Sequence, residues 1–302
     1  MKKKIAEPRY NHIDVKVAYA CNFRCEYCYQ TDKNGMRPAG MLSEENAGRL
    51  LSFIDRLGMH FQVTLAGGEP FIYPYLEKLA EGLAKRNCLI MIITNFSASN
   101  EKIGRFINIC GKSLKEFNIS IHISQWSDMD IFYDKLKDFL DTSEAWKFPF
   151  HVGCTCVVTE ENYEDVKALC ENMSLRFPSV SIRLHRVYYD GIYHKYPDNI
   201  EEFMHEHSVD VPKERMDDQQ YYGKPCWTGC RFFYIESDGT VYRCYTRQDD
   251  ENDWILGSLD DVDMIRVYRE AEPCKTADGG KCVCYEHFEN VGFVKNSDGE
   301  YK

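Results

Sequence analysis

Cys21-Asn-Phe-Arg-Cys25-Glu-Tyr-Cys28 places three cysteines within one short stretch of the chain. It follows residues 13–19, whose apolar side chains alternate as they do in a half-buried strand. Three thiols on a loop after a strand can reach three corners of a single metal cluster, and such crowded thiolates suit an iron–sulfur cluster. A [4Fe-4S] cubane has one more iron than this loop has cysteines, so the loop leaves one iron open. An open coordination position distinguishes a catalytic metal site from a closed structural one.

Two other interpretations of the three cysteines stay open. A zinc knuckle is one, although such a site usually has a fourth nearby Cys or His and favours paired C-x2-C spacing. A buried set of free thiols is the other, because free cysteine commonly packs as a small apolar residue.

A glycine-rich turn, Gly67-Gly68-Glu69-Pro70, follows the next strand-like stretch at residues 61–66. Glycines leave room for close approach of the backbone to a ligand. The C-x3-C-x2-C spacing, the aromatic Tyr27 before the third cysteine and this turn together resemble the radical SAM superfamily.

The resemblance implies a [4Fe-4S] cluster on Cys21, Cys25 and Cys28, whose open iron chelates the amino and carboxylate groups of S-adenosylmethionine (SAM). Reduction would yield a 5′-deoxyadenosyl radical that abstracts hydrogen from a substrate. Glu69, or the backbone just before it, is expected to accept hydrogen bonds from the SAM ammonium. The other residues implied to contact SAM are Tyr27, Gly67, Gly68, Asn95, Ser120, His122 and Arg183.

Several of these contacts have a plain alternative. Ser120 stands where relatives often use Ser, whereas His122 stands where many carry Asp. Each of these two, and Asn95 as well, could instead be a strand residue with a satisfied hydrogen bond. Arg183, with His185 and Arg186, could bind a carboxylate or phosphate on SAM or substrate. Solvated charges at a strand end are the alternative for these three.

Strand-like and helix-like stretches alternate over the first part of the chain, which implies parallel strand pairing with right-handed crossovers. The predicted strands are residues 13–19, 61–66, 88–93, 117–123, 150–158 and 180–184. The predicted helices are residues 43–57, 74–87, 100–110, 128–141 and 162–177. We therefore expect an α/β fold, a partial (β/α)6 TIM-type barrel, with the motifs at the carboxyl ends of the strands. The radical SAM core has this same fold.

A second group of cysteines begins at Cys226 and Cys230, before a predicted hairpin at residues 231–244 with a turn at Asp238-Gly239. It resembles the SPASM/twitch domains of radical SAM enzymes, which carry auxiliary [4Fe-4S] clusters. Six cysteines cannot fully ligate two cubanes, so we expect one auxiliary cluster. The resemblance implies a ligand set of Cys226, Cys230, Cys244 and Cys284, with Cys282 or Cys274 as alternatives for the last. A zinc ribbon is the other interpretation.

The expected domains are a radical SAM core at residues 10–186, a linker at 187–221 and a small cysteine-rich β-hairpin/helix domain at 222–302. Short helices are predicted near residues 201–207 and 262–270.

Three further residues are candidate catalytic groups. Tyr245 stands where sulfatase-maturing relatives carry a proton-accepting Asp; it is either a proton acceptor or radical relay, or a packed aromatic residue. Cys154 and Cys156 point to the same side of their strand. If that side faces the barrel lumen, one of them could donate a hydrogen atom, as in radical epimerases. Burial as small apolar residues is the alternative.

Composition limits the setting. The chain has 302 residues, 14 cysteines and a net charge of −11, which argues against nucleic-acid binding. Clustered cysteines indicate metal ligation in a reducing compartment. The N-terminus has no apolar signal segment, and no apolar run approaches the roughly 20 residues that span a bilayer. We expect a cytoplasmic protein with no membrane or nucleic-acid partner.

The functional expectation is a radical SAM oxidoreductase that modifies a peptide or protein side chain by crosslinking, epimerisation or oxidation. A radical SAM dehydrogenase of a small molecule such as an amino sugar is the alternative, and a metal-binding scaffold or electron carrier is the non-enzyme alternative. Expected partners are an electron donor such as flavodoxin or ferredoxin and a separate leader-peptide-binding protein. Because few residues precede the first strand, a peptide substrate would need such a protein or direct recognition by the mouth of the barrel.

Overall fold

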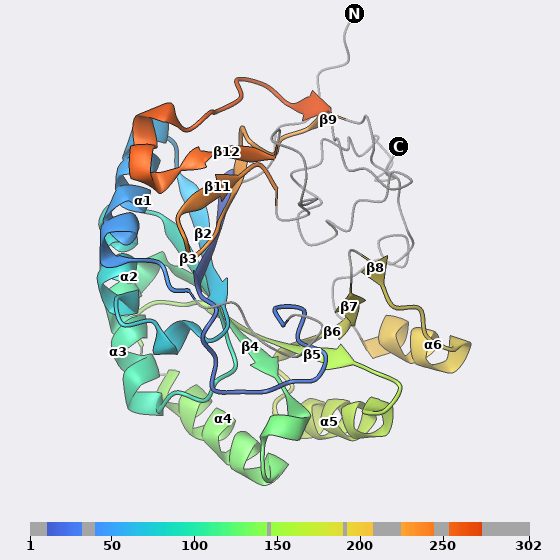
Figure 1. Ribbon diagram of the computed structural model, residues 1–302. Coiled ribbons are helices and arrows are strands. Elements are labelled where there is room, and N and C mark those ends of the chain that lie inside the picture. The colour runs from blue at the N-terminus through green and yellow to red at the C-terminus, as the bar shows by residue number, and fades with distance from the viewer. Residues whose placement is uncertain are drawn as a thin grey trace, which may run out of the picture. The chain divides into compact units, whose positions relative to one another are not determined.

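The computed structural model describes residues 11–31, 40–143, 146–189, 192–207, 225–244 and 254–273 (Figure 1). The chain forms two compact units. The larger unit consists of Val17–Met41 and Leu65–Pro212, and the smaller unit of Met1–Lys16, Leu42–Thr64 and Lys213–Lys302. Strands β1 (Asn11–Ala18) and β2 (Phe61–Gly67) contribute residues to both.

The larger unit is an α/β structure in which most strands of its sheet are followed by a helix. Its parallel strands are β3 (Leu89–Thr94), β4 (Leu114–Ile121), β5 (His151–Val158) and β6 (Ser181–Arg186), in the order β3-β4-β5-β6. One face of this sheet is covered by α2 (Leu76–Lys85), α3 (Asn100–Cys110), α4 (Met129–Ser143) and α5 (Tyr163–Arg176) (Figure 1). The predicted alternation of strands and helices is confirmed here, although β4 begins and ends earlier than predicted.

The two faces of the larger sheet differ in chemistry. On β4, Phe117 is fully buried and its ring lies 5.1 Å from the ring of Phe139 on α4. Because side chains alternate along a strand, Ser120 must point to the opposite face. Register then places Thr155 of β5 beside Ser120, and Arg183 of β6 beside Thr155. We call the face that carries these three residues and Asn118 the polar face.

The chain after β6 is attached to the sheet. A small hairpin, β7 (Tyr188–Tyr189) and β8 (Ile192–Tyr193), leads to helix α6 (Asp198–His207). Glu201 of this helix forms an ion pair with Arg186 at the end of β6. The Tyr196 hydroxyl donates to the carbonyl of Val158 and accepts from the N–H of Val187 at 3.1 Å. The segment predicted as a linker therefore contains, in its described part, packed structure that includes the predicted short helix.

The smaller unit contains helix α1 (Glu44–Leu57), with both ends as the sequence predicts. The Ser43 side chain accepts from the N–H of Asn46, and Gly58 ends the helix at φ 61°, a left-handed conformation that favours glycine. The strands of this unit are β9 (Pro225–Cys226), β10 (Phe232–Ile235), β11 (Thr240–Tyr242), β12 (Ile255–Ser258) and β13 (Glu272–Pro273). Strand β10 pairs antiparallel with β11, which confirms the predicted hairpin, and parallel with β1.

The helix predicted at residues 262–270 is wrong. The structure has instead a 3-10 segment, η4 (Leu259–Met264), followed by non-helical chain. The N–H of Arg266 donates to the carbonyl of Leu256, and the Arg56 guanidinium donates to the carbonyls of Val262 and Ile265. Backbone groups that a helix would pair internally are thus paired with other parts of the unit.

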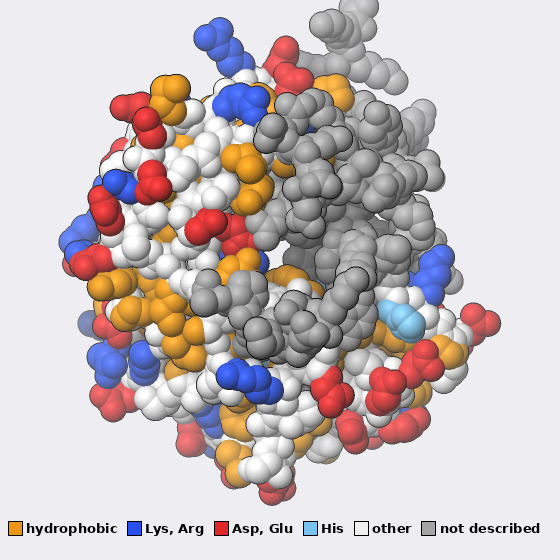
Figure 2. Space-filling model, viewed as in Figure 1, with side chains coloured by type: hydrophobic (Ala, Val, Ile, Leu, Met, Phe, Trp, Pro, Cys, Tyr) orange, Lys and Arg blue, Asp and Glu red, His pale blue; other side chains and the backbone are white. Residues whose placement is uncertain are grey.

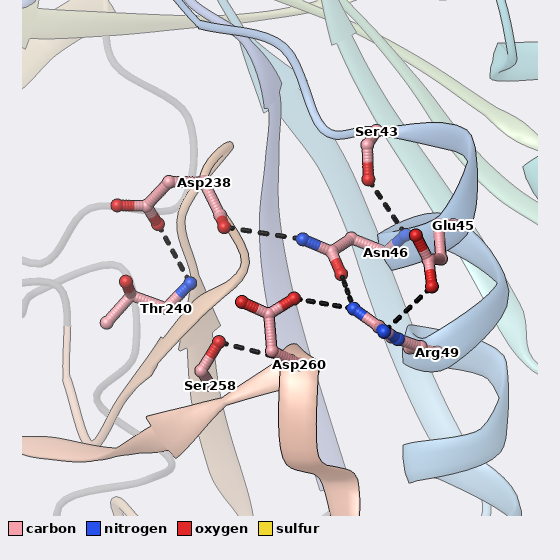
Figure 3. A network of polar contacts seen from close by, with 8 residues as sticks. All are labelled: Ser43, Glu45, Asn46, Arg49, Asp238, Thr240, Ser258 and Asp260. Carbon is pink, nitrogen blue, oxygen red and sulfur yellow. Dashed lines mark hydrogen bonds and ion pairs between the residues drawn. The ribbon is translucent and has the colours of Figure 1, made fainter.

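Polar contacts fasten α1 to the hairpin turn (Figure 3). The Asn46 amide donates to the Asp238 carbonyl at 3.3 Å. At Gly239, where φ is 90°, a Cβ would come within 2.5 Å of the same amide nitrogen, so the turn needs glycine. Arg49 contacts the side chains of Asn46 at 3.1 Å and Asp260 at 2.5 Å.

The two compact units do not coincide with the predicted domains at residues 10–186, 187–221 and 222–302. That division was based on the cysteine motifs, and it stays a prediction. Among the helices in the described ranges, none is long and apolar enough to cross a membrane. Acidic and basic side chains are interspersed over the described part of the face that Figure 2 shows.

Candidate active site

The Gly67-Gly68 turn is bonded to the start of the cysteine loop. The N–H of Gly68 donates to the Ala18 carbonyl at 2.7 Å, and the N–H of Glu69 donates to the Ala20 carbonyl at 2.8 Å. A Cβ on Gly67 would lie 2.2 Å from the oxygen of Ala18, so this close packing of two backbones requires glycine. From the sequence we expected these glycines to leave room for a ligand. The structure shows that they leave room for the backbone that enters the cysteine loop.

Glu69 is fully buried and its carboxylate points into the protein. It accepts from the Thr94 hydroxyl at 2.8 Å, the Phe71 N–H at 3.0 Å and the Asn95 N–H at 2.7 Å. Burial raises the pKa of the carboxyl, while these hydrogen bonds oppose the rise. The side chain therefore joins the ends of β2 and β3. That Glu69, or the backbone before it, binds the SAM ammonium stays a prediction.

Asn95 brings the end of β3 to the first cysteine. Its amide donates to the Asn22 side chain at 3.0 Å and lies 3.6 Å from the sulfur of Cys21. The N–H of Phe23 donates to the same sulfur at 3.4 Å. Hydrogen bonds to cluster sulfurs are among the factors that set reduction potential, so Asn95 lies where it would influence any cluster that Cys21 held.

The other two cysteines lie on the same loop. Cys25 is buried, and its carbonyl accepts from the N–H of Cys28 at 3.2 Å. Within the described part of the chain, no group of three or more His, Cys, Asp or Glu side chains is arranged to hold a metal ion. Three thiols on one loop, with N–H donors aimed at the first sulfur, nevertheless fit the chemistry of a thiolate-bound cluster.

Tyr27 and His122 form a stacked pair beside the loop. The Tyr27 hydroxyl lies 3.0 Å from Nδ1 of His122, and the two ring centroids are 5.9 Å apart. Phe23 meets the His122 ring edge-on at 6.0 Å. Burial, followed by nearby Cys25, raises the pKa of the Tyr27 phenol. His122 thus holds the aromatic residue of the cysteine motif, a role that its place after β4 did not reveal.

The polar face presents a hydrogen-bonded row. The hydroxyls of Ser120 and Thr155 lie 3.2 Å apart, and Thr155 donates to the Asn118 side chain at 3.2 Å. Arg183 is beside Thr155 in register and makes no hydrogen bond or ion pair with any described residue. Its guanidinium can therefore take an anion. Thr155 and Asn118 were missed by the sequence analysis, although both are polar residues that alternate with apolar ones in predicted strands.

Cys154 and Cys156 lie on the opposite face of β5 from Thr155. Register pairs them with Ile119 and Ile121, both fully buried. Burial raises the pKa of both thiols, and Cys170 on α5 is the neighbour that next raises that of Cys156. Because this is the helix-covered face, the condition set for hydrogen donation is not met, and packing as small apolar residues is favoured.

In the smaller unit, three thiols of the second cysteine group are buried near a buried arginine. Cys226, Cys230 and Cys244 are each less than a tenth exposed. The Cys226 sulfur lies 3.2 Å from the Thr228 hydroxyl, to which Nε of Arg243 donates at 3.1 Å. Desolvation raises the pKa of Cys226 to about 11.

Arg243 is 2% exposed and pairs with neutral groups, among them the carbonyls of Glu272 at 2.9 Å and Pro273 at 3.0 Å. No carboxylate of the described residues forms an ion pair with it, and a buried cation is costly without a nearby anion. The predicted site residues Tyr245, Cys274, Cys282 and Cys284 lie outside the described residues.

A family profile and curated relatives match the part of the chain that holds the cysteine loop and the glycine turn. The profile of the radical SAM superfamily matches residues 15–173. An S-adenosylmethionine-dependent nucleotide dehydratase of Lacinutrix mariniflava is 35% identical over 156 residues, which are 48% of this chain and 32% of that protein. The chain spans between about a quarter and about half of the length of the curated relatives it matches.

Solved structures agree on the fold. Streptococcus suis SuiB bound to precursor peptide SuiA superposes with a TM-score of 0.56 at 15% identity, covering 96% of this chain and 76% of that one. Native anSMEcpe with bound AdoMet gives a TM-score of 0.54 at 18% identity, covering 83% and 78%. At these identities the similarity extends to the α/β fold with its mostly parallel sheet.

Proposed function

The chain belongs to the radical SAM superfamily, and we propose that Cys21, Cys25 and Cys28 hold the catalytic [4Fe-4S] cluster of an enzyme that cleaves SAM reductively. The observation that carries this is the bonding of the Gly67-Gly68 turn to the chain entering the cysteine loop. When bound, the cluster supplies the electron that splits SAM into methionine and a 5′-deoxyadenosyl radical. Radical SAM enzymes need a reductant, for which flavodoxin or ferredoxin in the cytoplasm is our proposal.

The residues around the loop then have separate tasks. Asn95 and the N–H of Phe23 act on the Cys21 sulfur. His122 orients Tyr27. Ser120 and Arg183 on the polar face offer a hydroxyl and a guanidinium to the carboxylate of SAM or to an anionic group of the substrate.

We propose a peptide or protein side chain as the substrate, modified by crosslinking, epimerisation or oxidation. The second cysteine group supports this, because its hairpin has the pattern of domains that accompany peptide-modifying relatives. The SuiB structure with its precursor peptide also supports it by analogy of fold. Either a separate leader-binding protein or the enzyme itself would then recognise the peptide.

A small-molecule substrate is the second candidate. The observation that favours it is the Arg183 guanidinium without a protein partner on the polar face, which suits a phosphate or carboxylate. The relatives named as nucleotide dehydratases add to this. Under this alternative the enzyme would act on a nucleotide, or on a small molecule such as an amino sugar.

An auxiliary [4Fe-4S] cluster on Cys226, Cys230 and Cys244 is a further part of the proposal. The fourth ligand would be Cys284, or else Cys282 or Cys274. Buried Arg243 supports an anionic occupant, because thiolates would provide the negative charge that no described carboxylate supplies. This cluster would accept an electron from the substrate radical or anchor the substrate, with Tyr245 as the adjacent proton acceptor or radical relay.

The test of SAM cleavage uses protein reconstituted anaerobically with iron and sulfide, then treated with SAM and dithionite. We expect about eight irons per chain for two cubanes and 5′-deoxyadenosine detected by chromatography. Replacing Cys21, Cys25 and Cys28 by Ala should lower the iron to about four per chain and abolish 5′-deoxyadenosine. A reducible cluster that never cleaves SAM would instead favour an electron carrier, and bound zinc would favour a scaffold.

The auxiliary cluster is tested by substitutions in the smaller unit. Cys226→Ala and Cys244→Ala should each remove about four irons, while uncoupled SAM cleavage continues. Arg243→Met should weaken iron retention and Arg243→Lys should restore it in part. Zinc at this site, or unchanged iron in the cysteine variants, would contradict an auxiliary iron–sulfur cluster.

The substrate classes are separated by stimulation of SAM cleavage. Candidate precursor peptides from genes near the coding gene and a panel of nucleotides and amino sugars are added in turn. A true substrate should raise the amount of 5′-deoxyadenosine above the level formed without substrate, and its own mass should change. Arg183→Met should reduce the response to anionic small molecules and leave uncoupled cleavage detectable.

A further inference from the structure

The loop between β3 and α3 holds an unusual backbone conformation. Phe96 has φ 62°, in the left-handed region that non-glycine residues rarely adopt, and its side chain is fully buried. Its ring packs against Phe139 of α4 at 5.4 Å and Phe132 of α4 at 6.2 Å. Such a conformation persists only where the surroundings hold it, so the groups that bind this loop must fix its shape.

The side chain of Lys135 on α4 binds backbone carbonyls of this loop. Its ammonium donates to the Phe96 carbonyl at 2.7 Å and to the Ala98 carbonyl at 2.5 Å. It also lies 4.7 Å from the centroid of the Phe96 ring and 5.9 Å from that of Trp126. Hydrogen bonds from a charged donor and a cation over an aromatic face are both stronger where water is partly excluded.

Glu69 binds the other end of the same loop. Its carboxylate accepts from the Asn95 N–H at 2.7 Å. The step from Asn95 to Phe96 is therefore held by an anion at its N–H end and by a cation at its C=O end, which matches the direction of the peptide dipoles. From this fixed backbone, the Asn95 side chain extends to Cys21 and Asn22.

We propose that Lys135 is a positioning residue for the cysteine loop: its ammonium fixes the backbone at residues 96–98 so that the Asn95 amide stays directed at the Cys21 sulfur. The proposal rests on the proposed function only in giving Cys21 its role as a cluster ligand. It adds a residue from α4, outside every sequence motif, to the machinery of the site.

The first test uses the apo protein and compares Lys135→Met with Lys137→Met. Lys137 lies on the same helix, is exposed and pairs with Asp141 at 2.6 Å, so it is a matched control. In K135M we expect the amides of residues 96–98 to exchange hydrogen at least tenfold faster than in the parent. K137M should leave them unchanged. Equal exchange in both variants, with K135M folded, would overturn the proposal.

The second test uses reconstituted protein and measures the midpoint potential and spin-resonance spectrum of the cluster. K135M and Asn95→Ala should both shift the potential to more negative values, because the Cys21 sulfur loses a donor. The double variant should match N95A alone, since Lys135 acts through Asn95, and Lys135→Arg should restore much of the parent signal. A K135M shift that persists in full in the N95A background would overturn positioning in favour of a direct charge effect.

Folding is checked by circular dichroism. If K135M fails to fold, Lys135→Gln takes its place, because the amide keeps N–H donors without the charge. A parent protein that binds no cluster would count against the proposed function, whereas the exchange rates of the apo protein would still decide whether Lys135 holds the loop.

Discussion

Gly68 lies so close to Ala20 that a Cβ on Gly68 would come within 2.2 Å of the Ala20 carbonyl oxygen. The N–H of Glu69 donates to that same carbonyl at 2.8 Å. The glycine turn and the cysteine loop, which are separate motifs in the sequence, are thus one packed piece of backbone in the larger unit.

Gly68→Ala should displace the glycine turn relative to the cysteine loop, because neither backbone segment can move away without breaking a hydrogen bond. We expect uncoupled 5′-deoxyadenosine formation to fall about a hundredfold, as misplacements near 1 Å can do. The control is Gly104→Ala in α3, where a Cβ meets nothing within 4 Å. That change should stabilise the protein by about 0.5–1 kcal/mol. Equal activity of G68A and the parent would show that the close packing is dispensable.

The lowered pKa of Lys135 predicts that the stability of the apo protein depends on pH. Burial lowers the pKa of this lysine to about 8 from its usual 10.5, although nearby Glu69 opposes the shift. Between those values the unfolded chain binds more protons than the folded chain, so this residue adds stability as the pH rises from about 8 to 10.5. In K135M this contribution should be absent. Urea unfolding of both proteins at several pH values tests it, and a constant difference between them would contradict it.

Cys154→Ala and Cys156→Ala should leave 5′-deoxyadenosine formation unchanged, because both thiols lie on the helix-covered face of β5. Each should cost about 1 kcal/mol of stability through lost packing. Turnover is measured by chromatography and stability by urea unfolding. Loss of activity without loss of stability in either variant would return these cysteines to the list of candidate hydrogen donors.

Asn46→Ala and Arg49→Ala separate the buried and exposed parts of the network in Figure 3. Asn46 is 7% exposed, and its loss leaves the Asp238 carbonyl without this donor, so we expect a cost of about 1–3 kcal/mol. The partners of Arg49, Glu45 and Asp260, are mostly exposed, so R49A should cost about 1 kcal/mol or less. Thermal and urea unfolding measure both, and an R49A cost that exceeds that of N46A would reverse this ranking.

Local signals were enough to predict much of the fold. Ser43 and Gly58 bound α1 as predicted because cap preferences act within a single turn of the chain. The Asp238-Gly239 turn was also confirmed, since a positive φ at one position strongly selects glycine. The structure also places the cysteine loop, the Gly67-Gly68 turn and Asn95 in contact within the larger unit. Their binding of a cluster and of SAM stays a prediction.

Other features depend on contacts between distant residues and could not be predicted. Lys135 lies 39 positions from Phe96, and nothing in the amphipathic pattern of α4 distinguishes it from Lys137. Which face of β5 meets the helices was undecided until the register with β4 was known, so the orientation of Cys154 and Cys156 stayed conditional. The wrong helix at 262–270 has the same cause, because Arg56 takes carbonyls more than 200 positions away.

The parallel pairing of β1 with β10 has a consequence for anyone who shortens this chain. Residues His12 to Val15 share their register with Phe232 to Ile235. A recombinant fragment cut before the second cysteine group would lose this partner and expose a row of unpaired backbone N–H and C=O groups along β1. Such a bare edge is a template for association between chains. Insoluble fragments would then reflect a lost neighbour strand, and solubility screens of this protein should keep both ends of the chain together.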